Sequence, residues 1–171
     1  CCPELPGYEM AIEYHPAREV GGDLYDFRLE ADCARFHVVV GDVSGKSVPA
    51  ALYGAVFSGQ VRTLLSQSMP PREMLALLNR DLMARNRGNN FVAFAYLRLD
   101  LDRGEGVFAN AGMPYPCLLK NGRLSRLEAP GVPLALIEGT AYDEVPVRLD
   151  IGDTLILTSD GTTDAVDPLG R

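Results

Sequence analysis

The sequence lacks the features that would place the protein in or across a membrane. None of its apolar runs approaches the length of a membrane span, and its start shows no signal-peptide pattern. The four cysteines form no Cys-x-x-Cys pair and have no zinc-ligand spacing. Cysteines of this kind are typical of free thiols in a reducing compartment. These absences predict a cytoplasmic protein with no membrane partner.

The sequence also has fewer basic than acidic residues. Lysine and arginine number 16 against 23 aspartate and glutamate residues, which gives a formal net charge of -7. This balance argues against nucleic acid as a partner and suits a basic or metal-bridged ligand. With no internal repeat or low-complexity segment, residues 1–171 are expected to form a single domain. The chain opens on two cysteines and stops soon after a turn, so we expect it to be cut from a longer protein.

Hydrophobic patterning predicts an α+β domain. Runs that alternate or are rich in β-branched residues predict strands, and two longer periodic segments predict helices over Val48–Leu65 and Arg72–Arg87. The predicted strands are Tyr8–Tyr14, Asp23–Leu29, Arg35–Val40, Phe91–Leu101, Gly106–Ala111, Cys117–Lys120, Arg123–Glu128, Glu144–Leu149 and Thr154–Ser159. The sequence Asn121-Gly122 between two strands predicts a two-residue hairpin. Two adjacent helices among many strands favour a mostly antiparallel sheet system.

The first predicted helix has apolar residues on more than one face. Its start lies near Ser47, which is a good N-cap residue. Helical spacing predicts an inward face made of Val48, Ala51, Leu52, Ala55, Val56 and Gly59. A second stripe contains Phe57, Val61 and Leu64. This second stripe could serve either of two roles, burial in the core or contact in a homodimer.

The segment VVVGDVSGKSVPAAL, from Val38 to Leu52, has the parts of a nucleotide-binding P-loop. A P-loop needs four residues between its first glycine and the Gly-Lys pair, so that backbone N–H groups can surround the phosphates. Here only three residues separate Gly41 from Gly45. Asp42 would also point a carboxylate at phosphate oxygens, which requires a cation between them. The sequence therefore favours a metal at Asp42 over a nucleotide.

Three aspartates share one kind of position. Asp23, Asp42 and Asp160 each stand beside a glycine at a predicted strand end. Without His or Cys beside them, they would form an oxygen-donor site suited to Mg²⁺ or Mn²⁺. Each also has an ordinary alternative: Asp160 as a turn residue, Asp42 as a loop cap, and Asp23 as a surface residue. His15 and His37 fall in strand-like segments, where we expect structural roles.

Four motifs, in order along the chain, carry a family resemblance. The segment Pro16–Asp26, which reads PAREVGGDLYD, resembles the opening motif of the bacterial SpoIIE-type serine phosphatases. These enzymes belong to the metal-dependent protein phosphatases of the 2C type. The segment Gly41–Ala51 resembles their second motif, Asn110–Gly112 the third and Thr158–Gly161 the fourth.

The resemblance implies a fold and a set of site residues. The fold would be an αββα sandwich of two mostly antiparallel β-sheets flanked by helices, with a two-metal centre at one end. Asp42 would bridge the two metals, and the backbone carbonyl of Val43 would add a further oxygen. Asp23 would serve the second metal, directly or through water, and Asp160 the first. Arg18 would bind the substrate phosphate, or else be a surface arginine paired with a neighbouring carboxylate.

The resemblance also implies an activity. A water activated by two divalent cations, Mn²⁺ or Mg²⁺, would hydrolyse phosphoserine or phosphothreonine on a protein. This fits the absence of a Ser-His-Asp or Cys-Arg arrangement in the sequence. The substrate would be a phosphorylated signalling protein of the anti-sigma-factor antagonist type. An upstream sensor domain would precede the phosphatase.

Some positions depart from the family pattern. Ser44 stands where eukaryotic relatives have a histidine, Ser47 replaces a glycine, and Met113 stands where the family usually has histidine. The family's final metal-binding aspartate lies beyond the end of this sequence. We therefore expect residues 1–171 alone to be weakly active or inactive. A non-catalytic domain that binds a partner through the same fold is the alternative.

Overall fold

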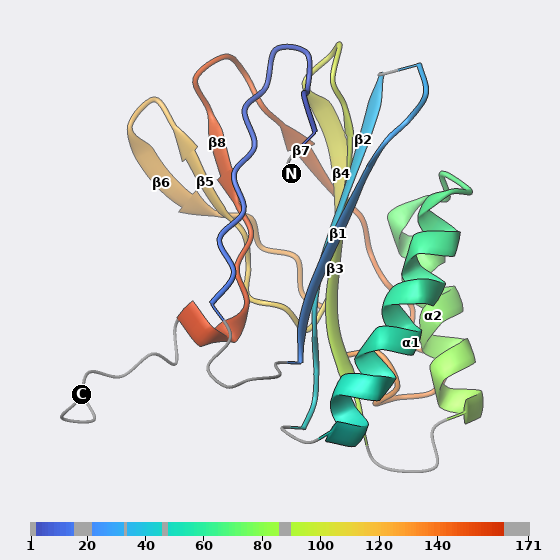
Figure 1. The fold of residues 1–171 in the computed structure, drawn as a ribbon. Coiled ribbons are helices and arrows are strands. Elements are labelled where there is room, and N and C mark those ends of the chain that lie inside the picture. Colours follow the sequence, from blue (N-terminus) through green and yellow to red (C-terminus); the bar gives the residue numbers. More distant parts are fainter. Residues whose placement is uncertain (1–2, 16–21, 33, 46–47, 86–89, 163–171) are drawn as a thin grey trace, which may run out of the picture.

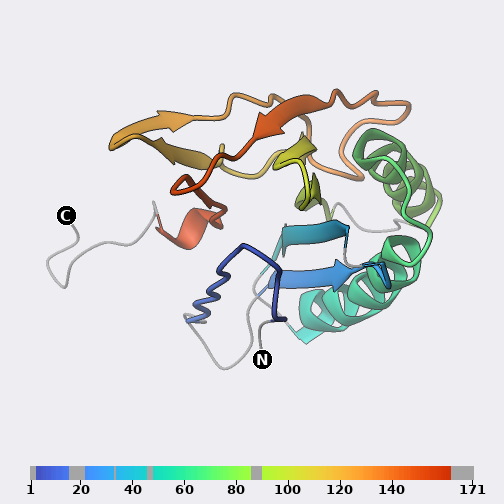
Figure 2. The same cartoon turned by 90° about the horizontal axis from the view of Figure 1, so that it is seen from above.

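The computed structural model describes residues 3–15, 22–32, 34–45, 48–85 and 90–162. Its elements form three layers, with two helices on one side of a five-stranded sheet and a three-stranded sheet on the other (Figures 1 and 2). Every strand pairing within both sheets is antiparallel. The prediction of an α+β domain with two antiparallel sheets is confirmed.

The strands follow a simple order. The five-stranded sheet contains, in spatial order, β1 (Asp23–Leu29), β2 (Arg35–Val43), β3 (Val92–Asp100), β4 (Glu105–Ala111) and β7 (Val145–Arg148). The three-stranded sheet contains β6 (Arg123–Arg126), β5 (Cys117–Lys120) and β8 (Thr154–Ile156). The turn between β5 and β6 has positive φ at both Asn121 (49°) and Gly122 (74°). These values are those of the type I′ turn that an Asn-Gly pair favours, so the predicted hairpin is confirmed.

Both helices, α1 (Val48–Leu65) and α2 (Pro71–Arg85), cover the same face of the five-stranded sheet. Phe57 of α1 meets Phe94 of β3 edge to face, with ring centroids 5.4 Å apart. Such aromatic pairs add to the stabilisation from burial alone. No helix within the described ranges is long and apolar enough to span a lipid bilayer.

The predicted inward face of α1 is wrong. Leu52 and Val56 are 66% and 68% exposed, whereas Phe57 and Val61 are 2% and 0% exposed. Both faces of α1 carry apolar residues, so spacing alone could not choose between them. The stripe with the larger side chains, which includes Leu64, contacts the sheet. Core burial is therefore the correct interpretation of that stripe, and its side chains are not available for a dimer contact.

The predicted strand Tyr8–Tyr14 is also wrong. This segment is extended but makes only an isolated bridge between Leu5 and Tyr8. It lies over the face of β1 and β2 rather than beside a strand edge, where a ladder of hydrogen bonds could form (Figure 1). Its alternating side chains pack on Phe36 and Leu99, which explains the strand-like pattern in the sequence.

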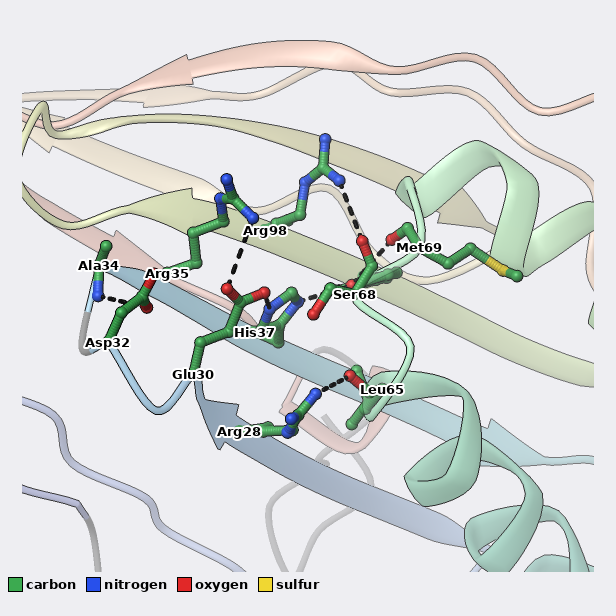
Figure 3. A network of polar contacts seen from close by, with 11 residues as sticks. Arg28, Glu30, Asp32, Ala34, Arg35, His37, Leu65, Ser68, Met69 and Arg98 are labelled. Carbon is green, nitrogen blue, oxygen red and sulfur yellow. Dashed lines mark hydrogen bonds and ion pairs between the residues drawn. The ribbon is translucent and has the colours of Figure 1, made fainter.

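Two arginines attach α1 to β1. Arg62 of α1 donates to both carboxylate oxygens of Asp26 in β1, at 3.0 and 3.2 Å. Arg28 of β1 donates to the carbonyl oxygen of Leu65 at 2.6 Å (Figure 3). The second contact satisfies a carbonyl at the helix C-terminus that has no partner within the helix.

A buried histidine connects the sheet to the turn between the helices (Figure 3). His37 is 0% exposed; its Nδ1 lies 2.7 Å from the Tyr96 hydroxyl and its Nε2 lies 2.9 Å from Glu30. The Tyr96 hydroxyl also donates to the carbonyl of Met69 at 3.2 Å. Burial lowers the pKa of His37, although the bond to Glu30 opposes this. The structural role expected for His37 is confirmed.

Candidate functional site

The pairing of β1 with β2 brings two of the predicted site residues together. Asp23 is the direct cross-strand partner of Asp42. Residues opposite each other in an antiparallel pair point to the same face, so both carboxylates lie on one side of the sheet. Val43, the next residue in β2, is buried among the helix-side core, which places Asp42 on the face toward the three-stranded sheet. Like charges in this position repel each other, and a cation between them removes that cost.

The backbone at Gly22 leaves room for this pair. Val43 donates its backbone N–H to the Gly22 carbonyl at 3.0 Å. A Cβ atom on Gly22 would lie 2.5 Å from Oδ1 of Asp42 and would collide with the carbonyl oxygen of Val43. The Asp42 carboxylate and the Val43 carbonyl therefore lie side by side, at a place that any side chain on residue 22 would fill.

Ser159 brings the third aspartate to the same end. Its hydroxyl donates to Oδ2 of Asp23 at 3.2 Å, across 136 positions of sequence. Asp160 follows directly as the first residue of a short 3₁₀ helix, Asp160–Thr162. Burial raises the pKa of Asp23, the negative charge of Asp160 raises it further, and the Ser159 hydrogen bond opposes both. Ser159 stands directly before Asp160 in the fourth motif, and the sequence around it does not indicate its contact with Asp23.

The donors gathered here fit a hard divalent cation in their chemistry. They are carboxylate and carbonyl oxygens without histidine or thiolate, as Mg²⁺ and Mn²⁺ prefer. Within the described ranges, no three His, Cys, Asp or Glu side chains already stand close enough to enclose a metal ion. The site is thus an oxygen-lined pair, Asp23 and Asp42, with Asp160 beside it.

Ser44, which stands where eukaryotic relatives have a histidine, makes a structural contact. Its hydroxyl accepts the backbone N–H of Phe91 at 2.8 Å, and its own N–H donates to the Phe91 carbonyl at 2.9 Å. Ser44 therefore joins the loop after β2 to the start of β3. Arg18 and Ser47 lie outside the described residues.

The third motif also has a structural role. Asn110 is 2% exposed, and its amide donates to the carbonyls of Met113 and Ala129, both at 2.9 Å. Its side-chain oxygen accepts the N–H of Met113 at 2.9 Å. Gly112 between them has a φ of 87°, which favours glycine. The motif thus fixes a tight turn after β4, and the amide capacity of Asn110 is used within it.

Comparison with known families identifies the chain. The family model described as Stage II sporulation protein E (SpoIIE) matches residues 32–171. The chain belongs to the SpoIIE family. It is 28% identical over 164 residues to the phosphoserine phosphatase RsbU of Bacillus subtilis (strain 168), a match that covers 95% of this chain and 48% of RsbU.

Solved structures share the fold of this SpoIIE-family chain. The RsbU and RsbW domains of Rv1364c from Mycobacterium tuberculosis match with a TM-score of 0.75 and 28% identity, over 85% of this chain and 40% of that one. RsbX, solved in complex with magnesium, matches with a TM-score of 0.68 over 85% of this chain and 69% of its own. Its identity of 16% shows the fold alone. The chain spans about half the length of RsbU and less than half of the Mycobacterium tuberculosis structure.

Proposed function

We propose that this chain is part of a metal-dependent protein serine/threonine phosphatase. The observation that carries the proposal is the cross-strand pair of Asp23 and Asp42, with Asp160 held beside it by Ser159. Membership of the SpoIIE family and similarity to a phosphoserine phosphatase support it. Paired carboxylates that repel each other are costly for the fold and useful to a cation site.

Five residues have assigned roles in this proposal. Asp42 would be a ligand of both cations, the Val43 carbonyl and Asp160 would be ligands of the first and Asp23 of the second, and Arg18 would bind the substrate phosphate. Bound Mn²⁺ or Mg²⁺ would polarise the phosphoryl group and lower the pKa of a water for in-line attack on phosphorus.

The neighbouring residues prepare this arrangement. Ser159 orients the Asp23 carboxylate through the 3.2 Å hydrogen bond, so that its other oxygen can face a cation. Gly22 keeps the space next to Asp42 clear of side-chain atoms. Ser44 holds the loop that follows Val43 against Phe91. No protein side chain is assigned as the proton donor to the leaving hydroxyl.

The substrate proposed is a phosphorylated anti-sigma-factor antagonist or a similar signalling protein. The similarity to RsbU and to a protein that carries both RsbU and RsbW domains supports this choice. In this proposal the whole protein is cytoplasmic and carries a sensor domain upstream. A homodimer stays a prediction.

The test is a calorimetric titration of the full-length protein with MnCl₂, followed by phosphate release from phosphoserine proteins. We expect saturable Mn²⁺ binding and turnover, and Asp42→Asn should lose both. Asp102→Asn, which changes an exposed carboxylate in the turn between β3 and β4, is the matched control and should keep both. Parent protein that binds no Mn²⁺ and releases no phosphate would favour the alternative, a non-catalytic partner-binding domain.

A further inference from the structure

Two tyrosines stand next to the carboxylate pair. Tyr25 follows Asp23 by two residues in β1, so the two side chains point to the same face of the sheet. Tyr14, from the segment before β1, packs against Tyr25 with ring centroids 6.1 Å apart and planes tilted by 59°. The rings come from two separate segments and form a small aromatic platform at the end of the sheet that carries the aspartates.

The platform begins where the core cover of this face ends. Further along the same face of β1, Phe27 and Leu29 pack with the N-terminal segment in a small hydrophobic cluster. This segment runs over the face of β1 toward the start of the strand (Figure 1). At the level of Tyr25 the described part of this cover ends, and Tyr14 is 43% exposed and Tyr25 45% exposed. Tyr25 is the single exposed residue of β1.

Core packing does not account for this exposure. Met10 and Ile12 precede Tyr14 in the same alternation and are partly buried. Tyr14 points to the same side as these two residues, but it is exposed where they are covered. Within the described residues, neither the Tyr14 nor the Tyr25 hydroxyl has a hydrogen-bond partner. Exposed aromatic rings with unpaired hydroxyls offer apolar area and donors together, which is the combination found at the centres of protein interfaces.

We propose that Tyr14 and Tyr25 bind the polypeptide beside the phosphoserine of the protein substrate. The occupant is a large apolar side chain of the substrate, which packs against the two rings and fits best when it is aromatic. A tyrosine hydroxyl donates a hydrogen bond to a carbonyl of the peptide backbone. This rests on the proposed function, because the adjacent Asp23 and Asp42 define where the phosphate sits.

Spacing determines which substrate residue reaches the platform. Asp23 and Tyr25 are two residues apart in a strand, which is about 7 Å. An extended peptide advances by a similar rise per residue, so the apolar side chain belongs about two to four residues from the phosphoserine. The platform would therefore select among phosphoproteins by sequence near the phosphorylated serine, without touching the reacting phosphate.

The test uses phosphoserine peptides with alanine at every flanking position, each carrying one phenylalanine at a different distance from the phosphoserine. With the full-length protein and Mn²⁺, we expect phenylalanine at the favoured position to raise kcat/KM about tenfold over the all-alanine peptide. Tyr14→Ser together with Tyr25→Ser should remove this gain and leave hydrolysis of p-nitrophenyl phosphate within about twofold of the parent. Tyr14→Phe with Tyr25→Phe keeps both rings and should retain most of the gain.

Leu124→Ser is the matched control. Leu124 is 67% exposed on β6, in the other sheet from Asp23 and Tyr25. Its replacement should therefore leave the phenylalanine preference intact. A preference that survives in the double serine variant, or no preference at any position, would overturn the platform.

A binding measurement separates this inference from the proposed function. Anisotropy of fluorescein-labelled peptides is measured with EDTA present, where no turnover occurs. If no substrate is hydrolysed, yet the parent binds the phenylalanine peptide about tenfold more tightly than the alanine peptide and the double serine variant does not, the platform stands and the phosphatase assignment fails. If p-nitrophenyl phosphate is turned over without any phenylalanine preference, the phosphatase assignment stands and the platform fails.

Discussion

At the scale of single residues, Gly22 offers the sharpest test of the site. Gly22→Ala places a methyl group 2.5 Å from Oδ1 of Asp42 and against a backbone carbonyl, which has little freedom to move. We expect Mn²⁺ affinity in the full-length protein to fall at least tenfold and the free energy of unfolding to fall by about 1–3 kcal/mol. Calorimetry and urea denaturation measure the two effects.

Gly59 supplies the matched control for that substitution. It lies in α1 with no atom within 4 Å of a Cβ added there. Gly59→Ala should therefore raise the free energy of unfolding by about 1 kcal/mol, because alanine favours a helix, and should leave Mn²⁺ binding unchanged. Unaltered Mn²⁺ affinity in Gly22→Ala would contradict the placement of the metal beside Asp42.

The three aspartates and Ser159 show how much of the site the sequence could predict. Asp23, Asp42 and Asp160 were recognisable because a strand end beside glycine is a local pattern. Their assembly depends on the β1–β2 register and on the Ser159 contact with Asp23, which joins positions 136 apart. No local pattern encodes a contact of that range, so the contact between Ser159 and Asp23 could be found only in the fold.

At the scale of elements, the buried histidine should make the attachment of the α1–α2 turn depend on pH. His37 has its pKa lowered by burial, so the folded protein favours the neutral ring while the unfolded chain takes up a proton near the ordinary value. The free energy of unfolding should therefore fall as pH drops from about 7.5 to 5.5. Urea denaturation across this range measures the slope.

The groups around His37 define the controls. Glu30 accepts from its ring, Tyr96 contacts the other ring nitrogen, and Arg28 and Arg98 lower its pKa by their positive charge. Glu30 has its own pKa lowered despite its partial burial, by hydrogen bonds and positive neighbours, so it loses its stabilising charge only at lower pH. His37→Gln should flatten the slope above about pH 5.5. A slope that persists in this variant would assign the effect to another group.

Prediction of the elements succeeded where the signal was local and failed where it was not. The Asn121-Gly122 turn and the strands with partners on both sides lie where the sequence predicted them, within a few residues. The segment Tyr8–Tyr14 alternates like a strand because it packs on a sheet face. Whether such a segment also forms a ladder of hydrogen bonds depends on a partner strand elsewhere in the sequence, which a local pattern does not reveal. In α1, the choice between two apolar faces depended on which side chains the sheet could accommodate.

At the scale of the whole molecule, the aspartate pair should lower the free energy of unfolding when no metal is present and raise it when a metal is bound. The protein carries a net charge of -7, and it places Asp23 where burial and Asp160 both raise its pKa. Asp23→Asn removes this half-buried charge, and its side-chain oxygen can still accept from Ser159. Without metal, we expect the variant to be more stable than the parent by about 0.5–1 kcal/mol.

Mn²⁺ should reverse that order. At a concentration about 100 times the dissociation constant, the parent gains about 2.7 kcal/mol because only the folded state holds the ion, while the variant gains far less. Denaturation of full-length parent and variant, each with EDTA and with MnCl₂, gives four free energies of unfolding whose order should change between the two conditions. A variant less stable than the parent in EDTA would mean that Asp23 stabilises the fold itself. The pair would then be a structural feature of the sheet end rather than a strained site maintained for a cation.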